Sequence, residues 1–405
     1  MAALLQKLRS PVSFPPETRH DLRLMRLLFL CMFGGFGITV SYFNLYLNSI
    51  GLSTPQIGQI AAVAPIIGMI GGPIWGLIND RLGMLRPLLS MMAIGAILIM
   101  AAIPQFNQFL PILLLWMAMS FVTNPVVTLL SGGTMRLLRE RPELYGRQRF
   151  WGSVGFILTS FLMGYVIQAL GLRWLFYGYI AVMVAFLISA LQLRPQPATI
   201  QQPLLRELKK LMQPAWIIFT VSMIIVGIAD SGMMNYLGIY ISNLGGSPTI
   251  VGWSFSIFAL SEVPVLMMGP WLIRKFGTTR LIFAGLFFYI IRFLALAVMP
   301  SPIWALPIGL LQGPSFCFLL VGGVELVNRL APDDLKSTAQ GLFITSLGYL
   351  PTVIGSIPSG IIFKEFGAQT LFFLYCGLTV AAIVLSATGT WLLTHRADTG
   401  EPTHL

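Results

Sequence analysis

Three ionisable residues interrupt long apolar stretches in the second half of the chain. Asp230 lies in "GIADSGMMNYLGIYI", Glu262 in "SEVPVLMM" and Arg292 in "FYIIRFLALAV". At the centre of a bilayer such a side chain costs roughly 2.5–3.5 kcal/mol, so it commonly has a partner or a function. A carboxylate beside an arginine can stay ionised and take up a proton when the arginine moves away. We therefore predict a proton-coupling group in which Glu262 pairs with Arg292. The alternative is a permanent ion pair that joins two helices.

A second set of polar residues in apolar stretches has the chemistry to bind a small solute. An amide or hydroxyl group inside a membrane helix hydrogen-bonds either a ligand or a neighbouring helix. An arginine adds a planar fork of donors that fits a carboxylate, although it can also act only as a charged anchor at a helix end. We expect a central cavity lined by Arg149, Asn44, Asn124, Asn235, Tyr236, Gln312 and Ser315.

Membrane-spanning helices must position these residues. The chain has 405 residues, of which 56% are hydrophobic and 10% charged, with a mean hydropathy of +0.82; soluble domains carry roughly 25% charged residues. A transmembrane helix needs about 20 apolar residues, and the apolar runs do not alternate as the strands of a β-barrel would. An all-α integral membrane protein is predicted, with twelve helices near residues 22–48, 54–78, 87–104, 108–134, 150–170, 174–193, 214–242, 249–273, 279–299, 303–329, 337–363 and 370–394.

The two halves of the chain resemble each other. "YFNLYLNSIGLSTPQIG" at residues 42–58 returns as "YLGIYISNLGGSPTIVG" at 236–252, a displacement of 194 residues. Gly83 and Gly277 share the same displacement. We therefore predict two six-helix pseudo-repeats, divided as an N-terminal half (1–193), a linker (194–213), a C-terminal half (214–394) and a tail (395–405).

The basic residues predict how the chain sits in the membrane. Of 25 Lys and Arg, 22 fall on one side of the predicted helices, Arg173 and Lys364 fall on the other, and Arg292 lies within. Loops rich in Lys and Arg stay in the cytoplasm, so both termini should be cytoplasmic and the lipid bilayer should be the cell (inner) membrane. The net charge of +11 then reflects topology and does not predict a nucleic-acid partner.

The segment between the second and third predicted helices carries a recognisable motif. "GLINDRLGMLR", residues 76–86, resembles the G-x-x-x-D-R-x-G-x-x-R signature of the major facilitator superfamily, whose two parallel halves rock about a central site. The resemblance implies that Asp80 pairs with Arg136 or Arg139 and that Gly76 admits a neighbouring helix. These contacts would form a conformational switch made of Gly76, Asp80, Arg81, Gly83 and Arg86; the alternative is that the charges only fix topology.

Other segments resemble one branch of that superfamily. "YGRQRFWGSVGF" (145–156), "SEVP" (261–264) and "LAPDDLKSTAQGL" (330–342) are similar to proton symporters of the lactose permease, phenylpropionate permease and nucleoside symporter group. In lactose permease the arginine matching Arg149 binds sugar together with a carboxylate, and Thr128 occupies that carboxylate position here. This difference favours an anionic ligand over a galactoside.

The resemblance implies a secondary active transporter that works by alternating access, with a proton and a sugar, nucleoside or aromatic or organic acid as partners. Efflux antiport with the same carboxylates is the first alternative, and a non-transporting membrane sensor is the second. Relatives commonly carry a histidine where this chain has Gln312, so coupling would rest on carboxylates alone. We find no nucleophile–histidine pair, no P-loop motif and no metal-ligand spacing among the three cysteines and three histidines. An enzyme, a cofactor and a bound metal are therefore not expected, and the protein is expected to be a monomer.

Overall fold

Helices make up all the regular structure that can be described. The computed structural model describes residues 14–138, 141–195, 214–332 and 335–398, with only the backbone for Asp80 and a few other helical residues. The N-terminal half contains α2 (Pro16–Ser49), α3 (Thr54–Leu82), α4 (Leu85–Ala102), η1 (Ile103–Gln105), α5 (Phe109–Leu137), η2 (Pro142–Leu144), α6 (Tyr145–Leu170) and α7 (Trp174–Leu191). The C-terminal half contains α8 (Pro214–Asn243), α9 (Pro248–Phe276), α10 (Thr278–Ala297), η4 (Pro302–Trp304), α11 (Ala305–Gly309), η5 (Gly313–Cys317), α12 (Phe318–Leu330), α13 (Lys336–Ile344), η7 (Thr345–Tyr349) and α14 (Leu350–Asp398).

These helices provide twelve membrane crossings. Within the described ranges, 11 helical segments are long and apolar enough to span a bilayer, and the last, Thr338–Gly389, has 52 residues. That segment bends at Gly367, whose φ of 82° and ψ of 169° are not helical, so it comprises two crossings. Another crossing, Pro302–Leu330, joins α11, η5 and α12. The predicted all-α, twelve-helix membrane fold is therefore confirmed.

The sequence repeat is visible in how corresponding helices begin and end. Ser53 precedes α3, and its backbone N–H donates to Gln56 Oε1 at 2.9 Å. Ser247, the equivalent residue before α9, accepts from the Ile250 amide at 3.4 Å. Both satisfy amides that a helix start leaves free. Gly83 and Gly277 end the same two helices with positive φ angles of 62° and 80°, which glycine adopts without a steric cost.

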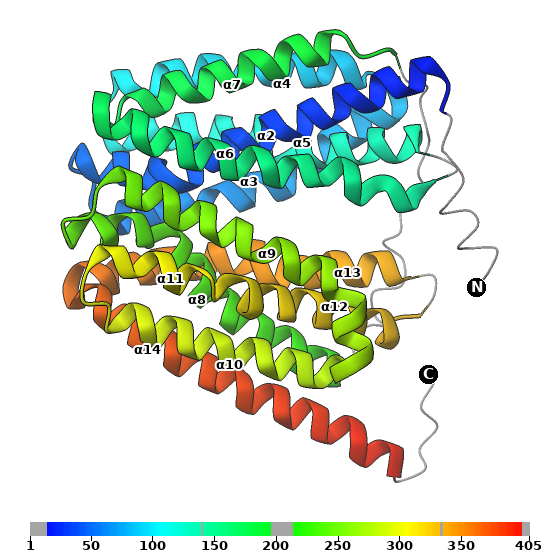
Figure 1. Ribbon diagram of the computed structural model, residues 1–405, viewed down its shortest axis with the longest axis vertical. Coiled ribbons are helices and arrows are strands. Elements are labelled where there is room, and N and C mark those ends of the chain that lie inside the picture. The colour runs from blue at the N-terminus through cyan, green and yellow to red at the C-terminus, as the bar shows by residue number, and fades with distance from the viewer. Residues whose placement is uncertain (1–13, 139–140, 196–213, 333–334, 399–405) are drawn as a thin grey trace.

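The crossings form two bundles that meet along their length (Figure 1). In the first bundle α2 packs against α6 and α7, and in the second α8 packs against α14. The bundles contact each other through α6 with α9, α3 with α14, and α2 with α8. Residues 196–213, which cover most of the predicted linker, and residues 399–405 of the predicted tail lie outside the described part. We call the end where α2 begins and α14 finishes the termini end, and the opposite end the far end.

Reciprocal tyrosine–glycine contacts join the two bundles near the far end. Tyr42 lies against Gly252, where an added Cβ would collide with its hydroxyl oxygen, and Tyr236 lies against Gly58, where an added Cβ would come within 2.6 Å of its hydroxyl oxygen. Each tyrosine comes from one half and each glycine from the other. The repeated "Y…G" pattern therefore encodes a pair of matched contacts between the halves.

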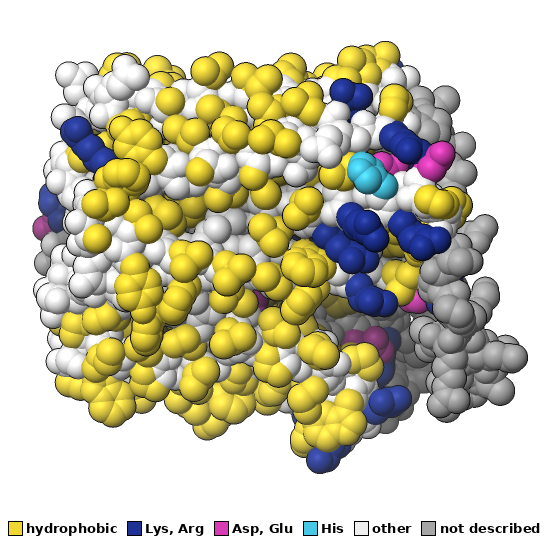
Figure 2. Space-filling model, turned by 45° about the horizontal axis from the view of Figure 1, so that its top comes forward, with side chains coloured by type: hydrophobic (Ala, Val, Ile, Leu, Met, Phe, Trp, Pro, Cys, Tyr) yellow, Lys and Arg dark blue, Asp and Glu magenta, His cyan; other side chains and the backbone are white. Residues whose placement is uncertain are grey.

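Two glycines of α3 nearer the termini end have no such neighbours. A Cβ added at Gly72 or Gly76, in the second part of α3, would have no atom within 4 Å. Figure 2 shows the surface hollowed between the bundles at this end, beside a cluster of Lys and Arg side chains. The two halves thus close against each other at the far end and separate toward the termini end.

Candidate functional site

A cavity of about 500 Å³ lies between the two bundles. This volume falls within the range of roughly 300–1,000 Å³ found for small-molecule sites. Both halves contribute to its wall, and its lining comprises Phe33, Thr39, Val40, Phe43, Asn44, Ala61, Ala64, Pro65, Trp116, Arg149, Ser153, Phe156, Met234, Asn235, Phe255, Phe258, Ala259, Glu262 and Thr352. Any ligand held there would touch both bundles at once.

Most of the wall is apolar and aromatic, with a few polar groups. Phe43 and Trp116 stack with their ring centroids 4.0 Å apart and an interplanar angle of 13°. Such a surface binds the flat or apolar face of a ligand, while isolated polar groups fix its orientation. The charged residues in the lining are Arg149 and Glu262.

Arg149 comes from the first turns of α6 and rests on an aromatic ring. Its guanidinium carbon lies 3.6 Å from the centroid of the Phe33 ring, an arrangement that a cation and a π face favour. No described carboxylate forms an ion pair with it, so its charge faces the cavity uncompensated by a direct partner. Arg149 can therefore receive an anionic or hydrogen-bonding group of a ligand.

Asn44 and Asn235 also line the cavity, one from each half. The Asn44 amide nitrogen donates to the Asn235 carbonyl oxygen at 3.0 Å, and the Asn235 amide nitrogen donates to Ser356 Oγ at 3.0 Å. The chain of hydrogen bonds ties α2 to α8 and α14. These asparagines therefore combine a position in the lining with a contact between the halves.

The other four predicted lining residues lie behind the cavity wall. Asn124 donates to the Ala64 carbonyl at 2.9 Å, and Tyr236 is fully buried with its hydroxyl donating to the Ser356 carbonyl at 2.8 Å. Gln312 and Ser315 are also buried. Each of the four uses its polar group on a neighbouring helix.

Sequence reasoning missed three hydroxyl residues in the lining, Thr39, Ser153 and Thr352. A signal for one of them was present: Ser153 follows Arg149 by four residues, and residues four apart share a helix face. Thr39 and Thr352 stand among apolar neighbours in α2 and α14 without a comparable marker.

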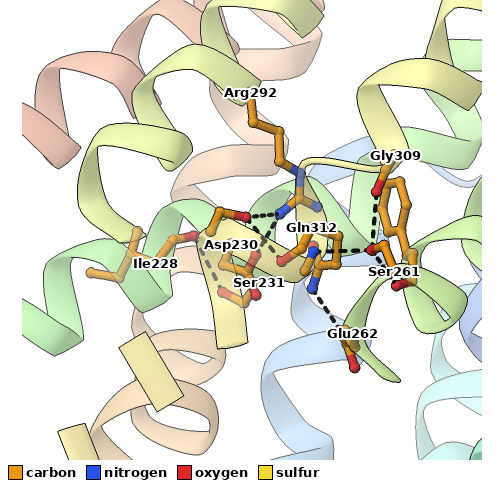
Figure 3. A network of polar contacts seen from close by, with 11 residues as sticks. Ile228, Asp230, Ser231, Ser261, Glu262, Arg292, Gly309 and Gln312 are labelled. Atoms are coloured by element: carbon orange, nitrogen blue, oxygen red, sulfur yellow. Dashed lines mark hydrogen bonds and ion pairs between the residues drawn. The ribbon is translucent and has the colours of Figure 1, made fainter. Parts of the chain in front are cut away.

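A buried ion pair lies directly behind the wall. Arg292 Nη1 is 3.4 Å from Asp230 Oδ1 (Figure 3). The same nitrogen donates to Ser315 Oγ at 3.3 Å. Arg292 is completely buried, and its guanidinium lies 4.8 Å from the Phe258 ring centroid. Its Nε and Nη2 atoms have no hydrogen-bond partner among the described residues. An arginine with unused donors in such surroundings depends on Asp230 for its charge balance.

Glu262 reaches the cavity and has a different partner from the one predicted. Gln312 Nε2 donates to Glu262 Oε1 at 3.0 Å (Figure 3), whereas Arg292 pairs with Asp230. Similar depth along two helices suggested a Glu262–Arg292 pair. Arg292 is completely buried, and its side chain extends from α10 to Asp230 on α8 instead of turning toward Glu262 on α9.

The predicted switch residues lie near the termini end of α3 and the start of α4. Gly83 ends α3, and the side chains of Arg81 and Arg86 are exposed. The side chain of Asp80, and Arg139 as a whole, lie outside the described residues. The predicted ion pair of Asp80 with Arg136 or Arg139 therefore lies outside the described residues. No group of three His, Cys, Asp or Glu able to hold a metal occurs in the described ranges.

Comparison with known proteins identifies relatives along almost the whole chain. Residues 22–374 match the MFS_1 like family. A maltose permease of Geobacillus stearothermophilus is 26% identical over 372 residues, which cover 89% of this chain and 92% of the relative. A probable 3-phenylpropionic acid transporter of Escherichia coli strain K12 is 22% identical over 306 residues, covering 73% and 79%.

The fold is also that of a solved transporter. The crystal structure of a mutant form of the nucleoside transporter NupG superposes with a TM-score of 0.81 at 16% identity and covers 92% of this chain and 99% of the other. Together with the two bundles and the cavity between them, the family match shows that this chain belongs to the MFS_1 like family of the major facilitator superfamily and is a secondary transporter.

Proposed function

We propose that the protein moves a small organic solute through the central cavity together with a proton, by alternating access. The observation that carries this proposal is the position of Glu262, an acid in the cavity wall with a buried Asp230–Arg292 pair behind it. The named relatives include a maltose permease and a probable 3-phenylpropionic acid transporter. Sugars, nucleosides and aromatic acids are therefore the solute classes to test.

The polar contacts around Glu262 support a coupling role. Gln312 bonds to Glu262, and Ser315 bonds both to the Gln312 carbonyl at 3.2 Å and to Arg292. One hydrogen-bonded network thus leads from the cavity to the buried ion pair. In our proposal Glu262 takes up and releases the proton, while the charges of Asp230 and Arg292 set the electrostatic field at the Glu262 carboxyl group.

The separation of the bundles at the termini end supports an inward-facing state. The 22-to-2 distribution of basic residues supports cytoplasmic termini in a cell membrane, and the hollow then opens to the cytoplasm. Arg149, Asn44 and Asn235 would bind the solute in the cavity. The protein would work as a monomer, because each chain contains both halves of the cavity.

The test begins with a thermal-shift screen of purified protein against maltose, nucleosides and 3-phenylpropionate. The solute that stabilises the protein is then assayed for uptake into proteoliposomes under an imposed pH gradient. The proposal expects accumulation driven by proton entry. Loss of solute from preloaded vesicles against its own gradient, driven by an opposing proton flow, would instead show antiport. No proton-dependent movement in either direction would refute the coupling.

A further inference from the structure

A second hollow, of about 260 Å³, lies at the termini end of the N-terminal half. It is formed where α2 begins and where η2 leads into α6, and it shares no residue with the central cavity. Its lining comprises Phe14, Arg19, Leu22, Arg23, Arg26, Leu144, Arg147 and Gln148. Half of these residues are arginines, and none is acidic. We call this site the arginine hollow.

The carboxylates nearest in sequence form no ion pair with these arginines. Glu17 forms an ion pair with Arg194 at 2.5 Å, and Glu143 forms one with Arg141 at 2.5 Å. Asp21 lies 3.7 Å from a nitrogen of His20. Among the described residues, no carboxylate lies within ion-pair distance of the four arginines of the hollow. Four like charges around one small volume repel each other unless an anion lies between them.

Hydrogen bonds to other residues of the chain hold two of the four arginines in place. Arg26 Nε donates to the Oε1 atom of Gln148 at 3.0 Å, and Gln148 is only 3% exposed. Arg19 Nε donates to the Phe14 carbonyl at 2.7 Å. Both bonds use Nε, and neither guanidinium makes another hydrogen bond to a described residue. Their Nη groups therefore remain for a ligand with several acceptor oxygens, such as phosphate, which arginine binds through paired bonds.

We propose that the arginine hollow binds a phosphate group, as the headgroup of an anionic phospholipid or as a soluble phosphate. Basic pockets between membrane helices on the cytoplasmic side bind such headgroups. The wall also contains Phe14, Leu22 and Leu144, which supply apolar contact beside the charge. This site is separate from the solute cavity, and the inference does not depend on the direction of transport or on the identity of the solute.

The test measures binding and not transport. Purified protein is titrated with dihexanoylphosphatidylglycerol, with dihexanoylphosphatidylcholine and with inorganic phosphate at constant ionic strength. The variant carries Arg23→Gln with Arg147→Gln, because both side chains are exposed and make no ion pair with a described residue. The matched control carries Arg274→Gln with Arg280→Gln, two exposed arginines at the same end of the other half. Size-exclusion profiles establish that all three proteins are folded.

We expect the Arg23/Arg147 variant to bind phosphatidylglycerol at least about tenfold more weakly than the wild type, given the contribution of each basic residue at a lipid surface. The control variant should change by less than about twofold, because Arg274 and Arg280 do not line the arginine hollow and so contribute no contact to a headgroup bound there. Binding of phosphatidylglycerol without inorganic phosphate identifies a lipid site, and binding of both identifies a general phosphate site. Unchanged affinity in the variant, equal losses in variant and control, or no binding by the wild type would overturn the proposal.

Discussion

Arg149 is the residue whose chemistry bears most directly on solute recognition. Its guanidinium rests on Phe33 and faces the cavity without a carboxylate partner among the described residues. Arg149→Lys retains the charge but loses the planar fork. A hydrogen bond to a charged group contributes about 1.5–3 kcal/mol, so KM for an anionic or polyhydroxylated solute should rise roughly 10- to 100-fold. Arg280→Lys, an exposed substitution in the other half, is the control, and a wild-type KM for Arg149→Lys would assign Arg149 to anchoring.

Asp230 should matter for stability because it provides the counter-charge of a fully buried arginine. Asp230→Asn leaves Arg292 unbalanced, and breaking a buried pair on one side costs about 3–5 kcal/mol. Thermal unfolding in detergent should show a large decrease in the unfolding temperature of this variant. The double variant Asp230→Leu with Arg292→Met should unfold at a temperature closer to that of the wild type, because neither charge is then left without its partner.

Glu325→Gln provides the comparison for that measurement. Glu325 pairs with Arg329 at 2.8 Å in an exposed position, and exposed pairs contribute at most about 1 kcal/mol. If Asp230→Asn unfolded at the wild-type temperature, the Asp230–Arg292 ion pair would not contribute to the stability of the protein.

At the scale of elements, the contact between α2 and α9 near the far end should control closure of the cavity. A Cβ at Gly252 would collide with the Tyr42 hydroxyl and with the Ser160 carbonyl oxygen. Gly252→Val should therefore prevent the halves from meeting and expose the cavity at the far end. The effect is measured as labelling of Val40→Cys by an impermeant thiol reagent applied from that side, with the three native cysteines replaced by serine.

Gly377→Val is the matched control for the labelling experiment, because a Cβ at Gly377 has no atom within 4 Å. With Gly377→Val, Val40→Cys should be labelled at the same low rate as in the parent, which is the Val40→Cys protein without native cysteines and without a glycine substitution. Equal labelling of Gly252→Val and the parent would mean that this contact does not hold the far end closed.

The elements were predictable because bilayer thickness and helix rise determine the length of an apolar run. The run before Gly367 and the run after it were visible as separate crossings, although the helix is continuous apart from that residue. The rotation of each helix about its axis was not predictable from one chain. For this reason the sequence did not reveal that Arg292 pairs with Asp230 instead of Glu262. It also did not reveal that Gln312 and Tyr236 lie behind the cavity wall. Amide and hydroxyl groups look alike in sequence whether they face a ligand or a neighbouring helix.

For the whole molecule, we predict cytoplasmic termini from the 22-to-2 distribution of basic residues and the even number of crossings. A reporter that is active only in the cytoplasm should be active when fused after Leu405. The same reporter inserted in the far-end loop at residues 245–247 should be inactive. Activity at both positions would be incompatible with twelve crossings in this orientation.

The central claim is that Glu262 couples solute movement to a proton. Glu262→Gln preserves shape and hydrogen bonding with Gln312 but cannot release a proton. Exchange of labelled for unlabelled solute leaves the carrier in one protonation state, whereas net accumulation requires both states. The account predicts that proteoliposomes containing Glu262→Gln exchange solute at near the wild-type rate and accumulate none under an imposed pH gradient. Full accumulation by this variant would contradict it.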